Sequence, residues 1–153
     1  MIKYCLDKWN RNSKRLEKVL ATDTKLNRCN YEYLVELVVK HILNDDDPDD
    51  NYEWSAKGIT EIDNGNYQGT LLYLIPRATY QPSEYDYLMT YVYYGSCGGC
   101  DTLQSIQNWS DSVMNAKQLG DFMILCKDLV DNMTRPYNSG WRNDPRFEEV
   151  RYE

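Results

Sequence analysis

Two cysteines separated by two glycines are the residues whose types and spacing best suit chemistry in this chain. They lie in the segment Tyr94-Gly95-Ser96-Cys97-Gly98-Gly99-Cys100-Asp101. So short and glycine-rich a segment buries little apolar surface, so backbone shape or local chemistry sets its composition. Four interpretations suit these residue types: thiol redox chemistry, zinc binding, nucleophilic catalysis, and recognition without a reaction.

Thiol redox chemistry uses a Cys-x-x-Cys pair at the start of a helix, where backbone N–H groups and the helix dipole lower a thiol pKa. The pattern around Cys97 and Cys100 predicts such a strand, loop and helix. A thioredoxin-like chain also needs strands and helices that alternate, whereas the segments before this pair predict a meander. Redox function therefore stays an alternative.

Zinc would need two ligands besides this pair, and nucleophilic catalysis would need a base. The remaining candidates in the sequence are Cys5, Cys29, Cys126 and His41. They form no second close pair, and the apolar pattern favours Cys126 as a small core residue. The only histidine falls at a predicted helix end, where it typically interacts with the last carbonyl groups. We expect no catalytic residue, metal or other cofactor, with zinc left as an alternative.

Recognition without a reaction is the interpretation that this segment favours. Glycines let a backbone turn tightly and present N–H groups before a helix, which suits an anion or a partner's carbonyl groups. Neighbouring tyrosines add flat contact surface. The candidate binding residues are Tyr91, Tyr93, Tyr94, Gly95, Ser96, Cys97, Gly98, Gly99, Cys100 and Asp101. The alternative is a tight strand-to-helix connection with buried cysteines.

Two helices are predicted before this region. Residues 6–20 form an amphipathic helix whose polar run, residues 10–15, would face water. The second helix begins after the N-cap Asn30, with Cys29 and Leu34 spaced as a hydrophobic staple. It ends at an acidic run.

That acidic run is Asp45-Asp46-Asp47-Pro48-Asp49-Asp50, and its alternate carboxylates resemble the start of a calcium-binding loop. The sixth position of such a loop would be Asp50, where the turn needs glycine. The twelfth would be Ala56, where a bidentate glutamate is needed. We therefore interpret the run as a solvated loop.

Three β-rich runs occupy the middle of the chain. Residues 54–62 and 70–75 predict a hairpin joined by the turn-forming residues 63–69. The second run is nearly continuously apolar, which suits a central strand covered on both faces and ended by Pro76. Residues 87–94 predict a third strand in which alternate side chains lie on opposite faces. It leads directly into the cysteine segment.

Two further helices are predicted after that segment. Asp101 is a favoured N-cap and Gln104 completes a capping box for a helix from Thr102 to about Trp109. Ser110 caps a longer helix whose apolar stripe runs over residues 119–133.

The order helix, helix, three strands, helix, helix predicts an α+β fold, a three-stranded antiparallel meander packed with about four helices. The 153 residues fit one domain, residues 1–153. Within it, residues 137–153 are expected to form an irregular C-terminal segment anchored by Trp141.

The formal net charge of −7, from 24 acidic and 17 basic residues, argues against a protein that holds nucleic acid by its phosphates, because such binding needs clustered Lys and Arg. We therefore expect no direct binding to nucleic acid or to an acidic membrane. The sequence has no apolar run of membrane-spanning length and no signal-peptide pattern, which favours the cytoplasm and reduced thiols.

Residues 65–75, 80–82 and 94–104 resemble a family of small uncharacterised bacteriophage proteins. The shared signature is Gly-Ser-Cys-x-x-Cys-Asp after a strand, here residues 95–101. The resemblance covers about residues 30–130. It implies a phage or prophage product expressed in the bacterial cytoplasm, and it assigns no activity and no functional residue.

From the charge, the missing catalytic constellation and this resemblance we expect a non-enzymatic phage accessory protein. It would bind and interfere with a host protein that has a basic surface, such as an enzyme or a defence component. One alternative is a protein that binds or sequesters a nucleotide-type ligand between the glycine loop and the tyrosines. The redox and zinc interpretations are the others, and homo-oligomer formation stays open.

Overall fold

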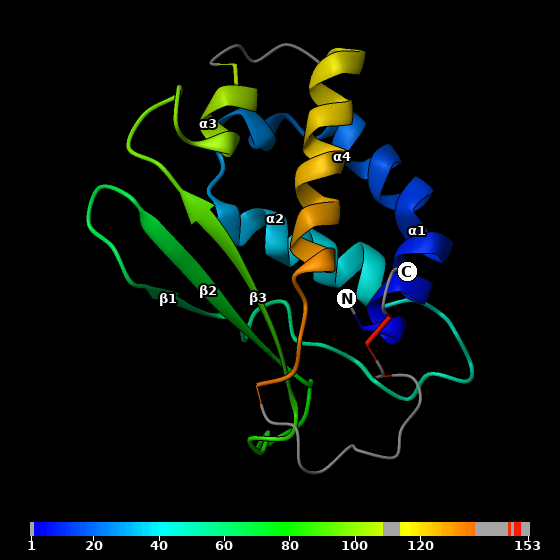
Figure 1. Cartoon of the computed structure of the whole chain (residues 1–153). Helices are drawn as coiled ribbons and strands as arrows, with labels where there is room; N and C mark the ends of the chain where they lie inside the picture. Colours follow the sequence, from blue (N-terminus) through cyan, green and yellow to red (C-terminus); the bar gives the residue numbers. More distant parts are fainter. Residues whose placement is uncertain (1, 109–113, 137–146, 148, 151–153) are drawn as a thin grey trace.

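The structure, a computed structural model, describes residues 2–108, 114–136, 147 and 149–150. Helices precede and follow a three-stranded antiparallel sheet, which confirms the predicted α+β fold (Figure 1). In chain order the elements are α1 (Lys3–Thr22), the 3-10 helix η1 (Thr24–Arg28), α2 (Tyr31–Val38), the π-helical turn η2 (Val39–Leu43), β1 (Thr60–Asp63), β2 (Gly69–Pro76), β3 (Tyr87–Tyr94), α3 (Thr102–Ile106) and α4 (Ala116–Asp131). No helix of the described part has the length and apolar character needed to cross a membrane.

The sheet has the order β1-β2-β3, with both neighbouring pairs antiparallel. Its third strand has the predicted bounds, whereas the first is much shorter than residues 54–62. Trp54 pairs only through an isolated bridge to Arg77, and its indole N–H donates to the Tyr4 hydroxyl at 3.0 Å. This buried side chain belongs to the core beside α1, so the chain joins the sheet only at Thr60.

One face of the sheet faces the hydrophobic core. The buried side chains of β2 and β3 on that face are Tyr73, Ile75, Leu88 and Thr90. On the opposite face Leu72 is half-buried, Ile62 is 46% exposed and Tyr93 is 70% exposed. The expectation that β2 is covered on both faces is therefore wrong, because Leu72 and Leu74 on the second face receive only partial cover.

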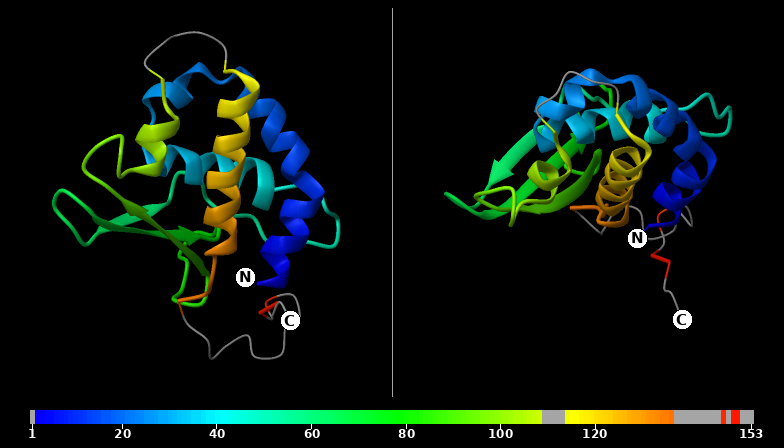
Figure 2. Two further views of the ribbon diagram at one scale, coloured as in Figure 1. Left: turned by 45° about the horizontal axis from the view of Figure 1, so that its top comes forward. Right: turned by 90° about the horizontal axis from the view of Figure 1, so that it is seen from above.

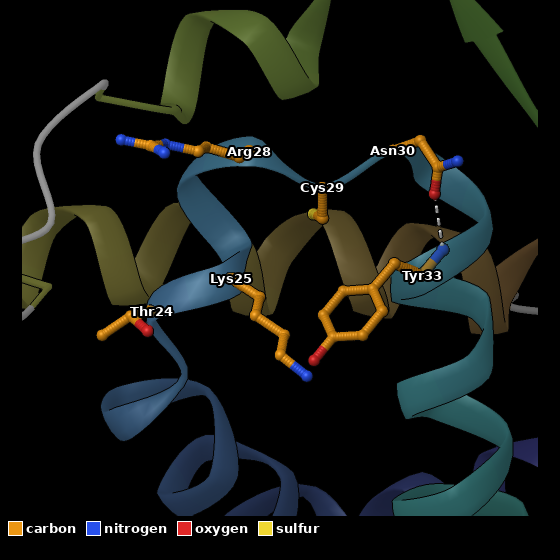
Figure 3. Close-up of a pocket in the computed structure, with 6 residues that line it drawn as sticks. All are labelled: Thr24, Lys25, Arg28, Cys29, Asn30 and Tyr33. Atoms are coloured by element: carbon orange, nitrogen blue, oxygen red, sulfur yellow. Dashed lines mark hydrogen bonds between the residues drawn. The ribbon is translucent and has the colours of Figure 1, made fainter.

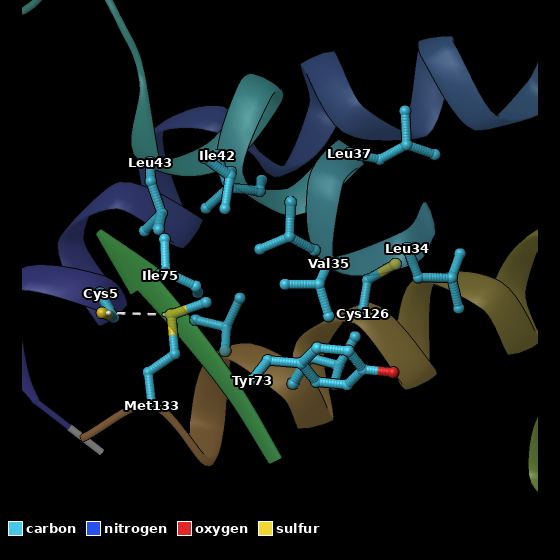
Figure 4. Close-up of a cluster of buried hydrophobic side chains, with 14 of the residues drawn as sticks. Cys5, Leu34, Val35, Leu37, Ile42, Leu43, Tyr73, Ile75, Cys126 and Met133 are labelled. Carbon is cyan, nitrogen blue, oxygen red and sulfur yellow. Dashed lines mark hydrogen bonds between the residues drawn. The ribbon is translucent and has the colours of Figure 1, made fainter. Parts of the chain in front are cut away.

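Helix α4 connects the layers, since it contacts β3 as well as α1, α2 and α3 (Figure 2). The Thr90 hydroxyl donates to the Leu129 carbonyl at 2.6 Å, which joins β3 to this helix. Cys126 is fully buried on the apolar face of α4, as predicted (Figure 4). Residues of α2, η2 and β2 complete the same cluster.

The acidic run is not simply a solvated loop, and this expectation needs correction. Lys8 of α1 is buried, and its ammonium lies 2.5 Å from a carboxylate oxygen of Asp45 and 2.5 Å from one of Asp50. Asn12, expected to face water, is also buried and donates to Asp45 at 2.8 Å. The run therefore folds back onto α1 because two of its carboxylates neutralise a buried lysine.

Three expectations concern residues that lie wholly or mostly outside the described part: Ser110 as a helix cap, Trp141 as an anchor and the irregular segment 137–153. Helix α4 begins at Ala116, and the Asn115 side chain caps it by accepting from the Gln118 N–H at 2.8 Å. In the C-terminal segment the described Phe147 is buried, and its ring stacks on Tyr4 with centroids 5.0 Å apart.

Candidate functional site

The cysteine segment follows β3 at the end of the sheet where β1 turns into β2 (Figure 1). Gly95 packs so closely on the next turn that an added Cβ would lie 2.8 Å from Sγ of Cys100 and closer still to the Cys100 carbonyl. An added Cβ at Gly98 would meet nothing within 4 Å. Close packing therefore requires glycine at Gly95 but not at Gly98. Residues Ser96 to Cys100 are exposed.

The two cysteines face each other in solvent across a tight turn. Their Sγ atoms lie 2.9 Å apart, and the Cys97 N–H points to the Cys100 sulfur at 3.2 Å. The N–H groups of Cys100 and Asp101 both donate to the Cys97 carbonyl, at 3.1 and 2.9 Å. These three N–H groups therefore do not form the predicted anion-binding nest, because they already bond to acceptors within the turn.

The side chains around the pair lower the pKa of the Cys100 thiol. Hydrogen bonds from Cys97 and Ser96 to the sulfur are the main cause. Burial acts in the other direction on Cys126 and on Cys29, and it raises each pKa to about 12. Cys97 and Cys100 are thus the exposed thiols, whereas Cys29 is half-buried and Cys5 and Cys126 are buried.

No third ligand or base joins this pair within the described residues. That part of the chain contains no group of three His, Cys, Asp or Glu side chains able to hold a metal ion. His41 makes no hydrogen bond to Ser96 or Cys97, and burial, with Arg15 and Lys40 nearby, lowers its pKa. The residues weighed for zinc and for a nucleophile–base pair are therefore not brought together.

Asp101 does not cap α3 in the predicted way. Its carboxylate is buried and accepts a hydrogen bond from the Tyr31 hydroxyl, and no side-chain cap bond forms. The same hydroxyl accepts from the Leu103 N–H at 3.1 Å, so Tyr31 performs the capping role from α2. The helix ends at Ile106. The Gln107 side-chain amide holds this end in place by donating to the carbonyl of Leu26 in η1 and to that of Cys29, the C-cap of η1.

A cavity of about 330 Å³ lies between the end of the sheet, the start of α2 and α3. We call it the acidic pocket. Its lining residues are Cys29, Asn30, Tyr31, Glu61, Asp63, Leu71, Tyr94, Gly95, Asp101, Leu103, Gln104 and Gln107. Three of them are carboxylates and none is Lys or Arg.

A neutral tyrosine hydroxyl donates to each of the three carboxylates. Tyr73 donates to Glu61 at 2.8 Å and Tyr94 to Asp63 at 2.6 Å, while the third is the Tyr31–Asp101 bond. The Tyr94 bond lowers the pKa of Asp63, which keeps that carboxyl ionised. No Lys or Arg in the described ranges forms an ion pair with these groups. The acidic pocket therefore carries uncompensated negative charge.

The structure divides the predicted binding residues between two faces of the sheet. Tyr94, Gly95 and Asp101 line the acidic pocket. Tyr91 and Tyr93 lie on the opposite face, where their rings meet edge to face with centroids 5.7 Å apart. The expected cavity between the glycine loop and several tyrosines is thus formed by one of these tyrosines only.

A second cavity, of about 550 Å³, lies on the other side of the η1–α2 junction (Figure 3). Its lining residues are Thr24, Lys25, Arg28, Cys29, Asn30 and Tyr33. Lys25 and Arg28 are the charged residues of this lining, and the Tyr33 hydroxyl contacts the nearby Asp23 carboxylate at 2.5 Å. We call it the basic pocket.

Sequence reasoning missed Glu61, Asp63 and Tyr31. The first two stand two residues apart in a strand, which places both on one face, so the sequence contained a usable signal for them. Tyr31 reaches Asp101 from seventy residues away, and no local pattern indicates that contact.

Comparison of the chain with family models, with curated proteins and with solved structures finds no match. The interpretation of the site therefore rests on its geometry and charge.

Proposed function

We propose that this is a non-enzymatic binding protein that receives a basic side chain of a protein partner in the acidic pocket. The observation that carries the proposal is the set of Glu61, Asp63 and Asp101 around one cavity, with which no Lys or Arg of the described residues forms an ion pair. A guanidinium or ammonium group forms short, charge-assisted hydrogen bonds with such carboxylates.

The volume and charge of the acidic pocket both suit this ligand class. Its volume of about 330 Å³ accommodates the end of a long side chain. The net charge of −7 adds a long-range attraction for a basic surface and speeds encounter at low salt. A nucleotide phosphate, by contrast, would be repelled by these carboxylates.

Exposed residues beside the acidic pocket extend the proposed contact. The turn from Ser96 to Cys100 projects into solvent next to Gly95, a lining residue. Such a turn offers polar groups around a central charged contact, as the rim of a protein interface does. The resemblance to bacteriophage proteins adds the proposal that the partner is a host enzyme or defence component.

A quantitative pulldown tests the proposal. Tagged wild-type protein in a bacterial lysate should enrich one partner in stoichiometric amount, and added salt should weaken the complex. The double variant Glu61→Gln, Asp63→Asn keeps a hydrogen-bond acceptor at each position but removes both charges, so it should lose that partner.

A matched control removes two charges elsewhere. Asp46 and Asp49 are exposed residues of the acidic run, and Asp46→Asn, Asp49→Asn should retain the partner. Equal recovery with both double variants would contradict a role for the acidic pocket, as would recovery of nothing above background with wild type.

A small anionic ligand is the second candidate, and the basic pocket favours it. Lys25 and Arg28 of η1 line this cavity together with Asn30, the N-cap of α2. A thermal-shift screen against nucleotides should raise the melting temperature of wild type and not of Lys25→Gln. No shift across the panel would remove this candidate.

A further inference from the structure

The exposed thiols of Cys97 and Cys100 are arranged for chemistry with each other. Their sulfurs are 2.9 Å apart, and the turn between them is closed by two backbone hydrogen bonds to the Cys97 carbonyl. Little backbone movement is needed to join residues that already face each other.

The surroundings distinguish the two thiols from the rest and from each other. Cys5 and Cys126 are fully buried, so an oxidant in solution cannot reach them in the folded protein. Cys100 accepts from the Cys97 N–H at 3.2 Å and has the Ser96 hydroxyl 3.7 Å away. Hydrogen bonds to the sulfur favour its thiolate form, which is the nucleophile in disulfide exchange.

We propose that Cys97 and Cys100 form a reversible disulfide, with Cys100 as the attacking thiolate and low-molecular-weight disulfides as the class of oxidant. This inference does not depend on a partner for the acidic pocket.

The reaction consists of two exchanges. The Cys100 thiolate attacks one sulfur of a disulfide R–S–S–R, forming a mixed disulfide and releasing one thiolate, RS⁻. The Cys97 thiol then loses its proton and attacks the Cys100 sulfur, which closes the protein disulfide and releases the second RS⁻. The two protein thiols lose two electrons in total, and the small disulfide is reduced to two thiols.

Oxidation would act at the edge of the acidic pocket. Gly95 and Asp101, which flank the turn, both line that cavity, and Gly95 packs against the Cys100 carbonyl. A disulfide between Cys97 and Cys100 would fix this turn and with it the position of the adjoining pocket wall.

Oxidised glutathione is the probe, and intact-mass measurement after acid quenching is the readout. Wild type should lose two accessible thiols, carry no glutathione, and recover both thiols with dithiothreitol. Cys97→Ser should stop at a mixed disulfide on Cys100, because no second thiol can resolve it. Cys100→Ser should react about tenfold more slowly near pH 7, since the contacts from the Cys97 N–H and the Ser96 hydroxyl are made to the Cys100 sulfur.

Cys29→Ser is the matched control and should behave like wild type, and thermal melting checks that each variant is folded. Stable glutathione on Cys29→Ser, which lacks the half-buried third thiol, would overturn the proposal, because it would show that Cys97 does not resolve the mixed disulfide. Equal reaction rates for Cys97→Ser and Cys100→Ser would overturn the assignment of Cys100 as the attacking residue.

Discussion

The carboxylates of the acidic run and those of the acidic pocket differ in the charge of the groups that hold them. Asp45 and Asp50 share the buried ammonium of Lys8. Glu61 and Asp63 accept only neutral hydroxyl and N–H groups. The first group is charge-compensated within the fold, and its loss should destabilise the protein. The second has charge left for an external cation, and its loss should affect binding alone.

The largest expected effect is the loss of stability in the variant Lys8→Met, which removes the cation that Asp45 and Asp50 share. Removing the ammonium leaves Asp45 and Asp50 facing each other in a buried site, at a cost of about 3–5 kcal/mol in the free energy of unfolding. Urea titration measures this cost. Lys18→Met on the exposed side of α1 should leave the urea midpoint unchanged. A mild effect of Lys8→Met would contradict a structural role for the acidic run.

Acid should act on the same cluster. Burial opposes ionisation of Asp45, but hydrogen bonds from Asn12 and Lys8 outweigh it and lower the pKa of Asp45 to about 2. Because the folded-state pKa lies below the ordinary value of 3.8, the stabilisation is complete above about pH 4 and is lost as the pH falls toward 2. Urea midpoints measured from pH 7 down to pH 2 should fall steeply in wild type. Asp45→Asn should flatten that fall, and an unchanged slope would contradict this assignment.

Tyr31→Phe should have an intermediate effect on stability. It removes the donor to the buried Asp101 carboxylate and the acceptor of the Leu103 N–H, for a loss of about 1–3 kcal/mol. Tyr33→Phe removes a single hydroxyl–carboxylate bond nearer the surface and is the comparison variant. Equal losses in chemical denaturation would mean that the Tyr31 bridge does not position α3.

The smallest stability effect is expected for Glu61→Gln, Asp63→Asn. Both side chains keep their acceptors for Tyr73 and Tyr94, so the melting temperature should match that of wild type. A marked loss of stability would show that the charges of the acidic pocket belong to the fold, as those of the acidic run do.

The sequence predicted the elements whose signals are local. Alternation defined β3, Asn30 caps α2 by accepting from the Tyr33 N–H, and the apolar stripe of α4 lies in the core. Each signal lies within one strand or one helix, so hydrophobic period and cap chemistry were sufficient to predict it.

Contacts between distant residues could not be predicted in this way. Lys8 contacts Asp45, which lies 37 positions away in the sequence. A lysine is buried only where other groups pair with its charge, so its burial could not be predicted without knowing those partners. Asp101 was a favourable cap by residue type, but the Tyr31 hydroxyl competes for its carboxylate and takes over the cap. The loop predicted from the sequence therefore adjoins the acidic pocket, whereas the carboxylates of Glu61 and Asp63 in its wall were missed.

An NMR titration with a blocked Gly-Arg-Gly peptide tests the acidic pocket most directly. In wild type the backbone amide signals of Asp63, Gly95 and Asp101 should shift saturably, and a blocked Gly-Glu-Gly peptide should leave them in place. The variant Glu61→Gln, Asp63→Asn should show no saturable shift. Absence of these shifts in wild type, or equal shifts in the variant, would contradict the proposal that this pocket binds a basic side chain.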